Sequence, residues 1–178
     1  MTRDAPPVRR MLAAGIPVGG GTDATRVASY NPWVGLGWLV SGRSVGGTEL
    51  LGPGARLSRV QALRLYTAGN GWFSGEDGQR GLIAEGRLGD LAVLSDDYFV
   101  VPEAEIRDIT SVLTVVGGDV VHASGDFGGL APPPLPFSPD WAPPAQYGGY
   151  DPGVAASALS WRPRRPHQHG LACPCAVF

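Results

Sequence analysis

The chain has 178 residues, of which 43% are apolar, enough for one domain with a hydrophobic core. The net charge of −2 and the pI near 5.9 provide no basic surface for nucleic acid or for an anionic membrane, so we expect neither partner. All 14 basic residues are Arg, which excludes lysine as a nucleophile, a general base or a carbamylated metal bridge.

The first predicted element is a short helix. Val8, Met11 and Leu12 follow two prolines at i, i+3, i+4 spacing, and the helix is expected to end at Gly15. Residues 16–24, "IPVGGGTDA", then indicate a buried strand that opens into a glycine-rich turn. The order helix, strand, loop is typical of an α/β unit.

The next two segments differ in how strongly they favour a helix. Residues 31–42, "NPWVGLGWLVSG", are compatible with a helix or with irregular structure, because their interior glycines lower helix propensity. Ser58 stands three residues before Gln61, the spacing of a capping box, and predicts a helix over residues 59–68. Residues 69–71, "GNG", are expected to end that helix.

From Gly81 onwards the pattern predicts a small β module. Residues 85–86 indicate a turn and residues 90–94 a strand, while residues 117–118, "GG", indicate a hairpin between two β-rich runs. The segment "PEAEIRDI" between them is expected to be a short helix or loop. After Asp126 the chain becomes Pro-rich and extended in character, and it cannot build a core of its own.

Four blocks in this order carry a family resemblance: "AGIPVGGGTDA…NPW", "LSRVQALRLYT", "GLIAEGRLGDLAVLSDDYF" and "ITSVLTVVGGDVVHA". Together they span roughly Met11 to Ala123. They resemble the C-terminal part of an amidohydrolase-superfamily enzyme, in the branch called amidohydrolase 3 or YtcJ-like. The resemblance implies an α/β fold: a metal-dependent hydrolase on a (β/α)₈ TIM barrel, flanked by a small β-sandwich built from both chain ends.

On this resemblance the chain divides into three parts. Residues 1–80 are expected to be a partial barrel remnant, the last β/α unit or units, in which residues 16–19 would be the eighth barrel strand. Residues 81–125 would supply the C-terminal strands of the sandwich, and residues 126–178 a Pro/Gly-rich extended tail. A complete barrel takes about 250 residues, so this chain is too short to hold one.

Asp23 is the candidate catalytic residue. The resemblance implies that it sits beside a divalent metal, zinc by family, and accepts a proton from the attacking water. Arg26 and Trp33 follow on the same loop and are candidate substrate-binding residues. From the residues alone a second interpretation stays open: Asp23 and Thr22 cap a turn by accepting backbone N–H bonds.

Most of the metal site implied by the family would lie upstream of these blocks. A catalytic zinc needs three protein ligands and a water, and Asp23 supplies one, so the chain alone is not expected to bind the barrel metal. A separate set of soft ligands occurs in the tail, at His167, His169, Cys173 and Cys175. Its spacing is not that of a structural zinc site, and the simpler interpretation is a solvated or docked terminus.

The remaining conspicuous side chains have structural interpretations. His122 is expected to be a packing or edge residue of a strand. Asp90, Asp96 and Asp97 are expected to be turn carboxylates. Large aromatic residues are expected mainly in the core; they are Trp33, Trp38, Trp72 and Phe73.

Three functions compete. The first is the C-terminal portion of a hydrolase of small molecules at carbon–nitrogen bonds, inactive alone and completed by a complementary upstream chain. The second is a non-catalytic interaction or homo-oligomerisation module, because one or two barrel units leave strand edges and an apolar face uncovered. The third is a metal or thiol function of the tail. With no uninterrupted signal-peptide core and no apolar stretch of about 20 residues, a cytoplasmic location is the default.

Overall fold

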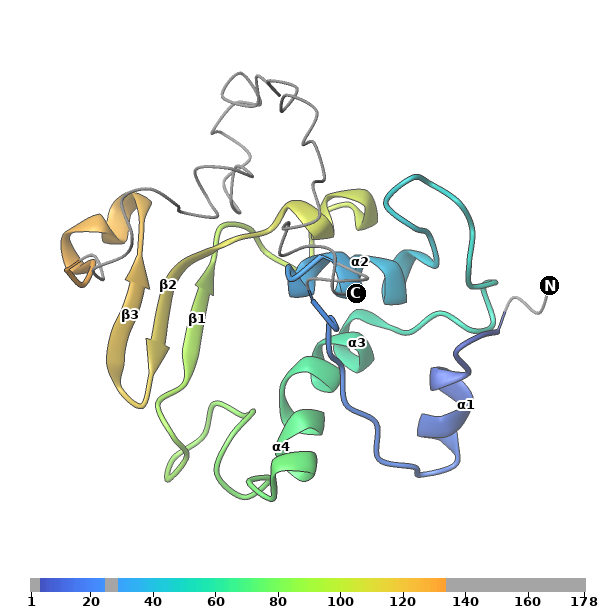
Figure 1. Cartoon of the computed structure of the whole chain (residues 1–178), viewed down its shortest axis with the longest axis horizontal. Coiled ribbons are helices and arrows are strands. Elements are labelled where there is room, and N and C mark those ends of the chain that lie inside the picture. Colours follow the sequence, from blue (N-terminus) through green and yellow to red (C-terminus); the bar gives the residue numbers. More distant parts are fainter. Residues whose placement is uncertain (1–3, 25–28, 134–178) are drawn as a thin grey trace, which may run out of the picture. The chain divides into compact units, whose positions relative to one another are not determined.

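The computed structural model describes residues 4–24 and 29–133 (Figure 1). The described residues all belong to one compact unit. The elements follow in the order α1 (Val8–Ala13), α2 (Pro32–Ser41), α3 (Arg59–Tyr66), α4 (Ala68–Ser74), β1 (Leu91–Leu94), the 3-10 helix η1 (Glu103–Asp108), β2 (Ser111–Val116), β3 (Asp119–Ala123) and the 3-10 helix η2 (Gly125–Leu130). The fold is therefore mixed helix and sheet.

Helix α2 forms in the segment whose sequence left helix and irregular structure open. The Asn31 side chain caps it by accepting a hydrogen bond from the Trp33 backbone N–H at 2.9 Å, and Pro32 occupies the first turn, where proline costs no hydrogen bond. Gly42 ends the helix in the left-handed conformation, with φ +72°. Signals at both ends thus outweigh the low propensity of the glycines within.

The helix predicted over residues 59–68 is confirmed at its start and wrong at its end. Ser58 and Gln61 form the complete capping box. The helix breaks at Thr67, and α4 continues directly through the predicted stop to Ser74. Gly69 serves close packing instead, since a Cβ there would lie 2.7 Å from the Val18 carbonyl oxygen.

The predicted β module is confirmed as a three-stranded antiparallel sheet in the order β1-β2-β3 (Figure 1). The turn between β2 and β3 is made by Gly117 and Gly118, both with positive φ, as a two-residue hairpin of this kind requires. Asp90 accepts a hydrogen bond from the Gly117 N–H at 2.8 Å, which ties the start of β1 to the hairpin turn.

The hydrophobic core joins α2 and α3 to the segment that contains η1. Ile106 of η1 and Ile109 just after it are completely or almost completely buried beside α2. Residues from both the 1–80 and the 81–125 segments therefore contribute to one cluster. Its buried members are Leu36, Leu39, Val40, Leu57, Ala62, Leu65, Tyr98, Ile106 and Ile109.

Two expectations about the N-terminal half are wrong. Residues 16–19 form no strand, because none of the described strands lies beside them to supply hydrogen-bond partners. Ile16 is also not buried, since 47% of it is exposed. Trp72 and Phe73 are also outside the core, at 56% and 59% exposure, although they contact each other edge to face. Trp33 and Trp38 do pack against the core, as expected, and are partly buried.

Candidate functional site

The glycine-rich segment before Asp23 is fitted closely to α3 and α4. A Cβ on Gly19 would lie 2.4 Å from the Asn70 side-chain oxygen, and one on Gly20 would lie 2.6 Å from the Tyr66 ring. Two hydrogen bonds fix the same place: the Gly20 N–H donates to the Leu65 carbonyl at 2.8 Å, and the Asn70 side-chain amide donates to the Gly20 carbonyl at 2.9 Å. A larger residue at either position would require the neighbouring side chains to move, so glycine allows this approach without rearrangement.

Asp23 follows this fitted segment with an unusual backbone. Its φ of +48° makes it the one non-glycine residue in the left-handed region among the described residues, a conformation that costs roughly 1 kcal/mol or more. The side chain is exposed, and neither it nor Thr22 hydrogen-bonds to any described residue. The turn-capping interpretation is therefore not seen, and the carboxylate is open to groups from elsewhere.

The other predicted site residues divide into those that lie inside the described ranges and those that lie outside. Arg26 and the tail ligands His167, His169, Cys173 and Cys175 lie outside the described residues. Trp33 lies on the first turn of α2 and is held by the core, with its ring centroid 5.6 Å from that of Tyr98. The observed contacts of Trp33 therefore support its interpretation as a packing residue.

The structural interpretations of the remaining polar residues are confirmed. His122 lies exposed on β3, an outer strand of the sheet, in register with Thr114. Asp97 accepts a hydrogen bond from the Phe99 N–H at 2.8 Å, and Asp96 from the Ser95 hydroxyl at 2.7 Å. These carboxylates stabilise turns and do not form an acid/base pair.

Within residues 4–24 and 29–133, no group of three or more His, Cys, Asp or Glu side chains could hold a metal ion. Asp23 contributes one exposed carboxylate, and a catalytic zinc needs three protein ligands. The described residues therefore do not fit a metal centre by themselves.

Tyr98 of the core and Arg59 of α3 contact each other through several polar groups. The Tyr98 hydroxyl donates to the Arg59 carbonyl at 3.0 Å, and the Arg59 guanidinium donates to the carbonyls of Tyr98 and Val101 and lies 5.7 Å from the centre of the Tyr98 ring. Burial raises the pKa of Tyr98 to about 12, although the Arg59 charge opposes this shift. The pair stabilises the junction between α3 and the segment after β1.

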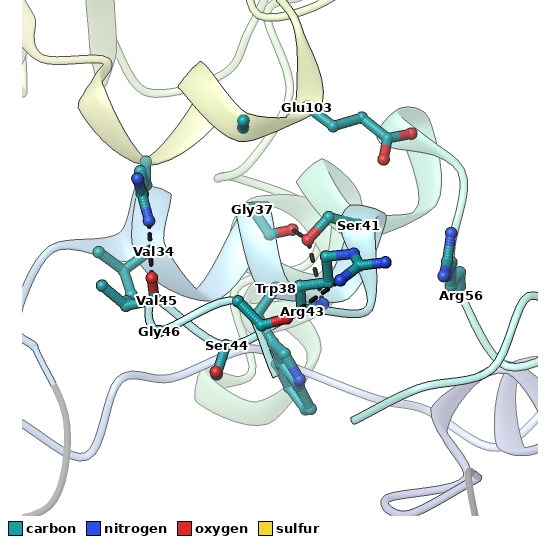
Figure 2. A pocket seen from close by; sticks show the side chains of 13 residues that line it. Val34, Gly37, Trp38, Ser41, Arg43, Ser44, Val45, Gly46, Arg56 and Glu103 are labelled. Atoms are coloured by element: carbon teal, nitrogen blue, oxygen red, sulfur yellow. Dashed lines mark hydrogen bonds between the residues drawn. The ribbon is translucent and has the colours of Figure 1, made fainter. Parts of the chain in front are cut away.

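Sequence reasoning missed a cleft of about 580 Å³ beside the C-terminal half of α2. Figure 2 shows Arg43, Arg56 and Glu103 around it, with Trp38 and Ser41 from α2. Arg107 of η1 also belongs to the lining. These residues are scattered over more than sixty positions of the chain, and no local pattern in the sequence indicated that they meet.

Comparison with known proteins assigns the family. A profile described as "Amidohydrolase family" matches residues 1–122 of the 178. The chain belongs to the amidohydrolase family. Members of this family generally use a divalent metal. The resemblance given by the four sequence blocks is thus confirmed.

Two curated relatives match part of this amidohydrolase-family chain. The "Putative amidohydrolase YtcJ" of Bacillus subtilis (strain 168) is 30% identical over 118 residues, which are 64% of this chain and 22% of the relative. The "N-substituted formamide deformylase" of Arthrobacter pascens is 30% identical over 112 residues, 63% of this chain and 20% of the relative. The chain thus spans about a fifth of the length of these relatives. No solved structure matches it significantly.

In the part of the chain that the structure describes, no helix has the length and apolar character needed to cross a membrane.

Proposed function

We propose that this chain is the C-terminal portion of a metal-dependent hydrolase of small molecules at carbon–nitrogen bonds other than peptide bonds, and that it is inactive alone. The family match supports the reaction class. The support for inactivity is that the described residues include no group of three or more side chains that could hold a metal, in a chain that spans about a fifth of the length of its relatives. A complementary upstream segment would supply the remaining groups.

Within that enzyme, residues 1–80 would be the end of a TIM barrel, residues 81–125 the strands of a β-sandwich, and residues 126–178 a Pro/Gly-rich extended tail. The sheet β1-β2-β3 is compatible with the second part, because its antiparallel strands leave both outer edges available for further pairing. A cytoplasmic location remains our expectation for the whole enzyme.

Asp23 would be the catalytic residue of this reaction. Hydrolysis of a C–N bond requires a water to lose a proton and the leaving nitrogen to gain one, and one well-placed carboxylate can perform both transfers. The supporting observation is that the Asp23 carboxylate makes no hydrogen bond to a described residue, while its backbone has the left-handed φ of +48°. Trp33, and Arg26 between Asp23 and Trp33 in the sequence, would contact the substrate.

A chimera tests the proposal. The aligned segment of the Arthrobacter pascens deformylase is replaced by residues 1–122 of this chain, and hydrolysis of an N-substituted formamide is measured. We expect no turnover by the 178-residue chain alone, turnover by the chimera, and a loss of roughly a hundredfold or more in the Asp23→Asn chimera. Asp119→Asn is the matched control, because Asp119 is an exposed carboxylate in the hairpin.

Circular dichroism and metal content establish whether each chimera folds. If the chimera is misfolded, the 178-residue chain is instead supplied as a separate polypeptide to a deformylase that lacks the aligned segment. Turnover by the isolated chain would overturn its proposed inactivity. Equal rates for Asp23→Asn and Asp119→Asn in a folded, active chimera would remove Asp23 from the mechanism.

A second candidate function is a non-catalytic interaction or homo-oligomerisation module. Several large apolar side chains on α4 and the sheet are exposed by more than 40%, which is unfavourable for a monomer in water. They are Trp72, Phe73, Leu91, Val93, Val116 and Val121. Sedimentation over a roughly hundredfold concentration range would show self-association by mass action, weakened in Trp72→Ser/Phe73→Ser. A stable monomer throughout would exclude this candidate.

A further inference from the structure

The cleft beside α2 is built from three separate parts of the chain. Trp38 and Ser41 come from α2, residues 43–47 form the loop that follows it, and Glu103 and Arg107 come from η1 (Figure 2). Because α2 and η1 pack against each other in the core, two sides of the cleft have fixed positions. A volume of about 580 Å³ is within the range of small-molecule sites.

Three guanidinium groups line the cleft, and each is held by a backbone carbonyl. Arg43 Nη1 donates to the Gly47 carbonyl and Arg107 Nη1 to the Val45 carbonyl, both at 3.0 Å, while Arg56 Nε donates to the Leu51 carbonyl at 3.4 Å. A guanidinium has five N–H donors, so one such bond restricts the side chain and leaves the remaining donors for a ligand.

The charge of the lining is unbalanced. Among the described residues Arg43 and Arg56 form no ion pair, and Arg107 has only a long contact to Asp108 at 3.9 Å. Glu103 is the one carboxylate in the lining, and it pairs with none of these cations. The lining therefore holds three guanidinium groups and one carboxylate, and among the described residues only Asp108 pairs with one of these cations, so the net charge of the lining is positive.

An unused donor lies in the same wall. The Trp38 indole N–H is buried and has no acceptor among the described residues. A buried donor without a partner costs about 1–3 kcal/mol. Because this nitrogen is closed to water-sized molecules, a ligand in the cleft does not reach it, and the arginines of the lining carry the inference.

We propose that the cleft binds a small oxyanion with at least two negative charges, of the phosphate or dicarboxylate class. Arg43, Arg56 and Arg107 would donate charge-assisted hydrogen bonds to its oxygens, the interaction in which the planar guanidinium group is strongest. Glu103 opposes the ligand charge and limits affinity. The site is separate from Asp23 and needs no catalytic activity.

Titration calorimetry of the 178-residue chain at pH 7.5 and low salt tests the site, with inorganic phosphate and succinate as probes and chloride as the reference anion. We expect saturable binding of at least one probe and roughly tenfold weaker binding in Arg43→Gln and in Arg107→Gln. Arg64→Gln is the matched control, because Arg64 is an exposed arginine on α3 away from the cleft lining.

Arg43 and Arg107 also hold the loop, so a loss of binding could reflect a disordered loop. Glu103→Gln separates the two effects, because it removes an opposing charge and is expected to tighten binding about threefold, which damage to the loop would not do. Preference for phosphate or for succinate assigns the oxyanion geometry. Absence of saturation with both probes, or equal affinities in Arg43→Gln and Arg64→Gln, would overturn the proposal.

Discussion

Two regions of this amidohydrolase-family chain differ in how far they bury their apolar side chains. Around α2, α3 and η1 the side chains of Leu36, Ile106 and Ile109 are buried to 1% exposure or less. On β1, by contrast, Leu91 and Val93 are each 41% exposed. The first region removes its apolar side chains from water by packing them against one another. The second leaves apolar surface that the described residues do not cover.

The difference separates elements that bury their apolar side chains against one another from elements that leave them exposed. The packed region, around α2, α3 and η1, also receives the segment with Gly19 and Gly20, which lies close to the side chains of Tyr66 and Asn70. The sheet and α4 instead resemble one side of an interface. Both regions use ordinary local structure, so tertiary burial and not secondary structure distinguishes them.

The largest effect is expected from a truncation in the packed region. Ile106→Ala removes a completely buried side chain of η1 and should lower the free energy of unfolding by about 2–5 kcal/mol, through lost burial and the cavity that remains. Val121→Ala, at a position that is 49% exposed on β3, should cost less than about 1 kcal/mol. Urea denaturation measures both, and equal costs would contradict the division into two regions.

A glycine pair on α2 gives the next effect. Gly42 has φ +72°, and a Cβ there would lie 2.5 Å from the Leu51 carbonyl oxygen, so Gly42→Ala should cost about 2–3 kcal/mol. At Gly37 a Cβ would make ordinary contacts of 3.6 Å and longer, chiefly with Ile106 and its neighbour. Gly37→Ala should therefore be neutral or stabilise by up to about 1 kcal/mol. Thermal unfolding of the two variants tests this contrast.

Alkaline pH should weaken the packed region through Tyr98. Burial raises its folded pKa from 10.0 to about 12, so between these values the unfolded state releases a proton that the folded state retains. The stabilisation is complete below pH 10 and is lost as the pH rises towards 12, by roughly 1–2 kcal/mol. Burial raises the pKa of Tyr66 as well, in the same direction.

Denaturation of wild type and Tyr98→Phe between pH 9 and 12 measures this loss of stability at alkaline pH. The variant should be less stable at pH 7, since its hydrogen bond to the Arg59 carbonyl is lost, and should show a shallower decline at high pH. The chain contains no lysine, which removes the other common group that titrates in this range. Parallel declines in the two proteins would assign the alkaline effect to other residues.

The sequence predicted those elements whose ends carry specific side-chain or turn chemistry. The capping box at Ser58 and Gln61 and the hairpin at Gly117 and Gly118 depend on residues close in the chain, and both are confirmed. The family assignment likewise came from ordered local blocks. Local sequence was sufficient for the capping box and the hairpin, because the residues that decide each of these structures lie within a few positions of one another.

The failures concern contacts between distant residues. Gly69 is adapted to the backbone near Val18 and does not end a helix, and Gly19 and Gly20 fit against α3 and α4. The pattern of residues 16–24 predicts a strand, which the family resemblance places at residues 16–19, but a strand requires partners that local sequence does not specify. The arginine cleft escaped notice for the same reason, since its residues meet only through packing of α2 against η1.

The smallest effect separates capped from uncapped helices. Ser58→Ala removes the acceptor for the Gln61 N–H, 3.2 Å away, at the start of α3 and should cost about 1 kcal/mol, while Ser58→Thr should retain most of the stability. Helix α1 has no side-chain cap and no buried residue, so Pro7→Ala before it should change stability by less than about 0.5 kcal/mol. Urea midpoints at constant m-value give both numbers. If Ser58→Ala were as mild as Pro7→Ala, burial of Ala62 and Leu65 would hold α3 without its cap, and the packed region would owe its stability to tertiary contacts alone.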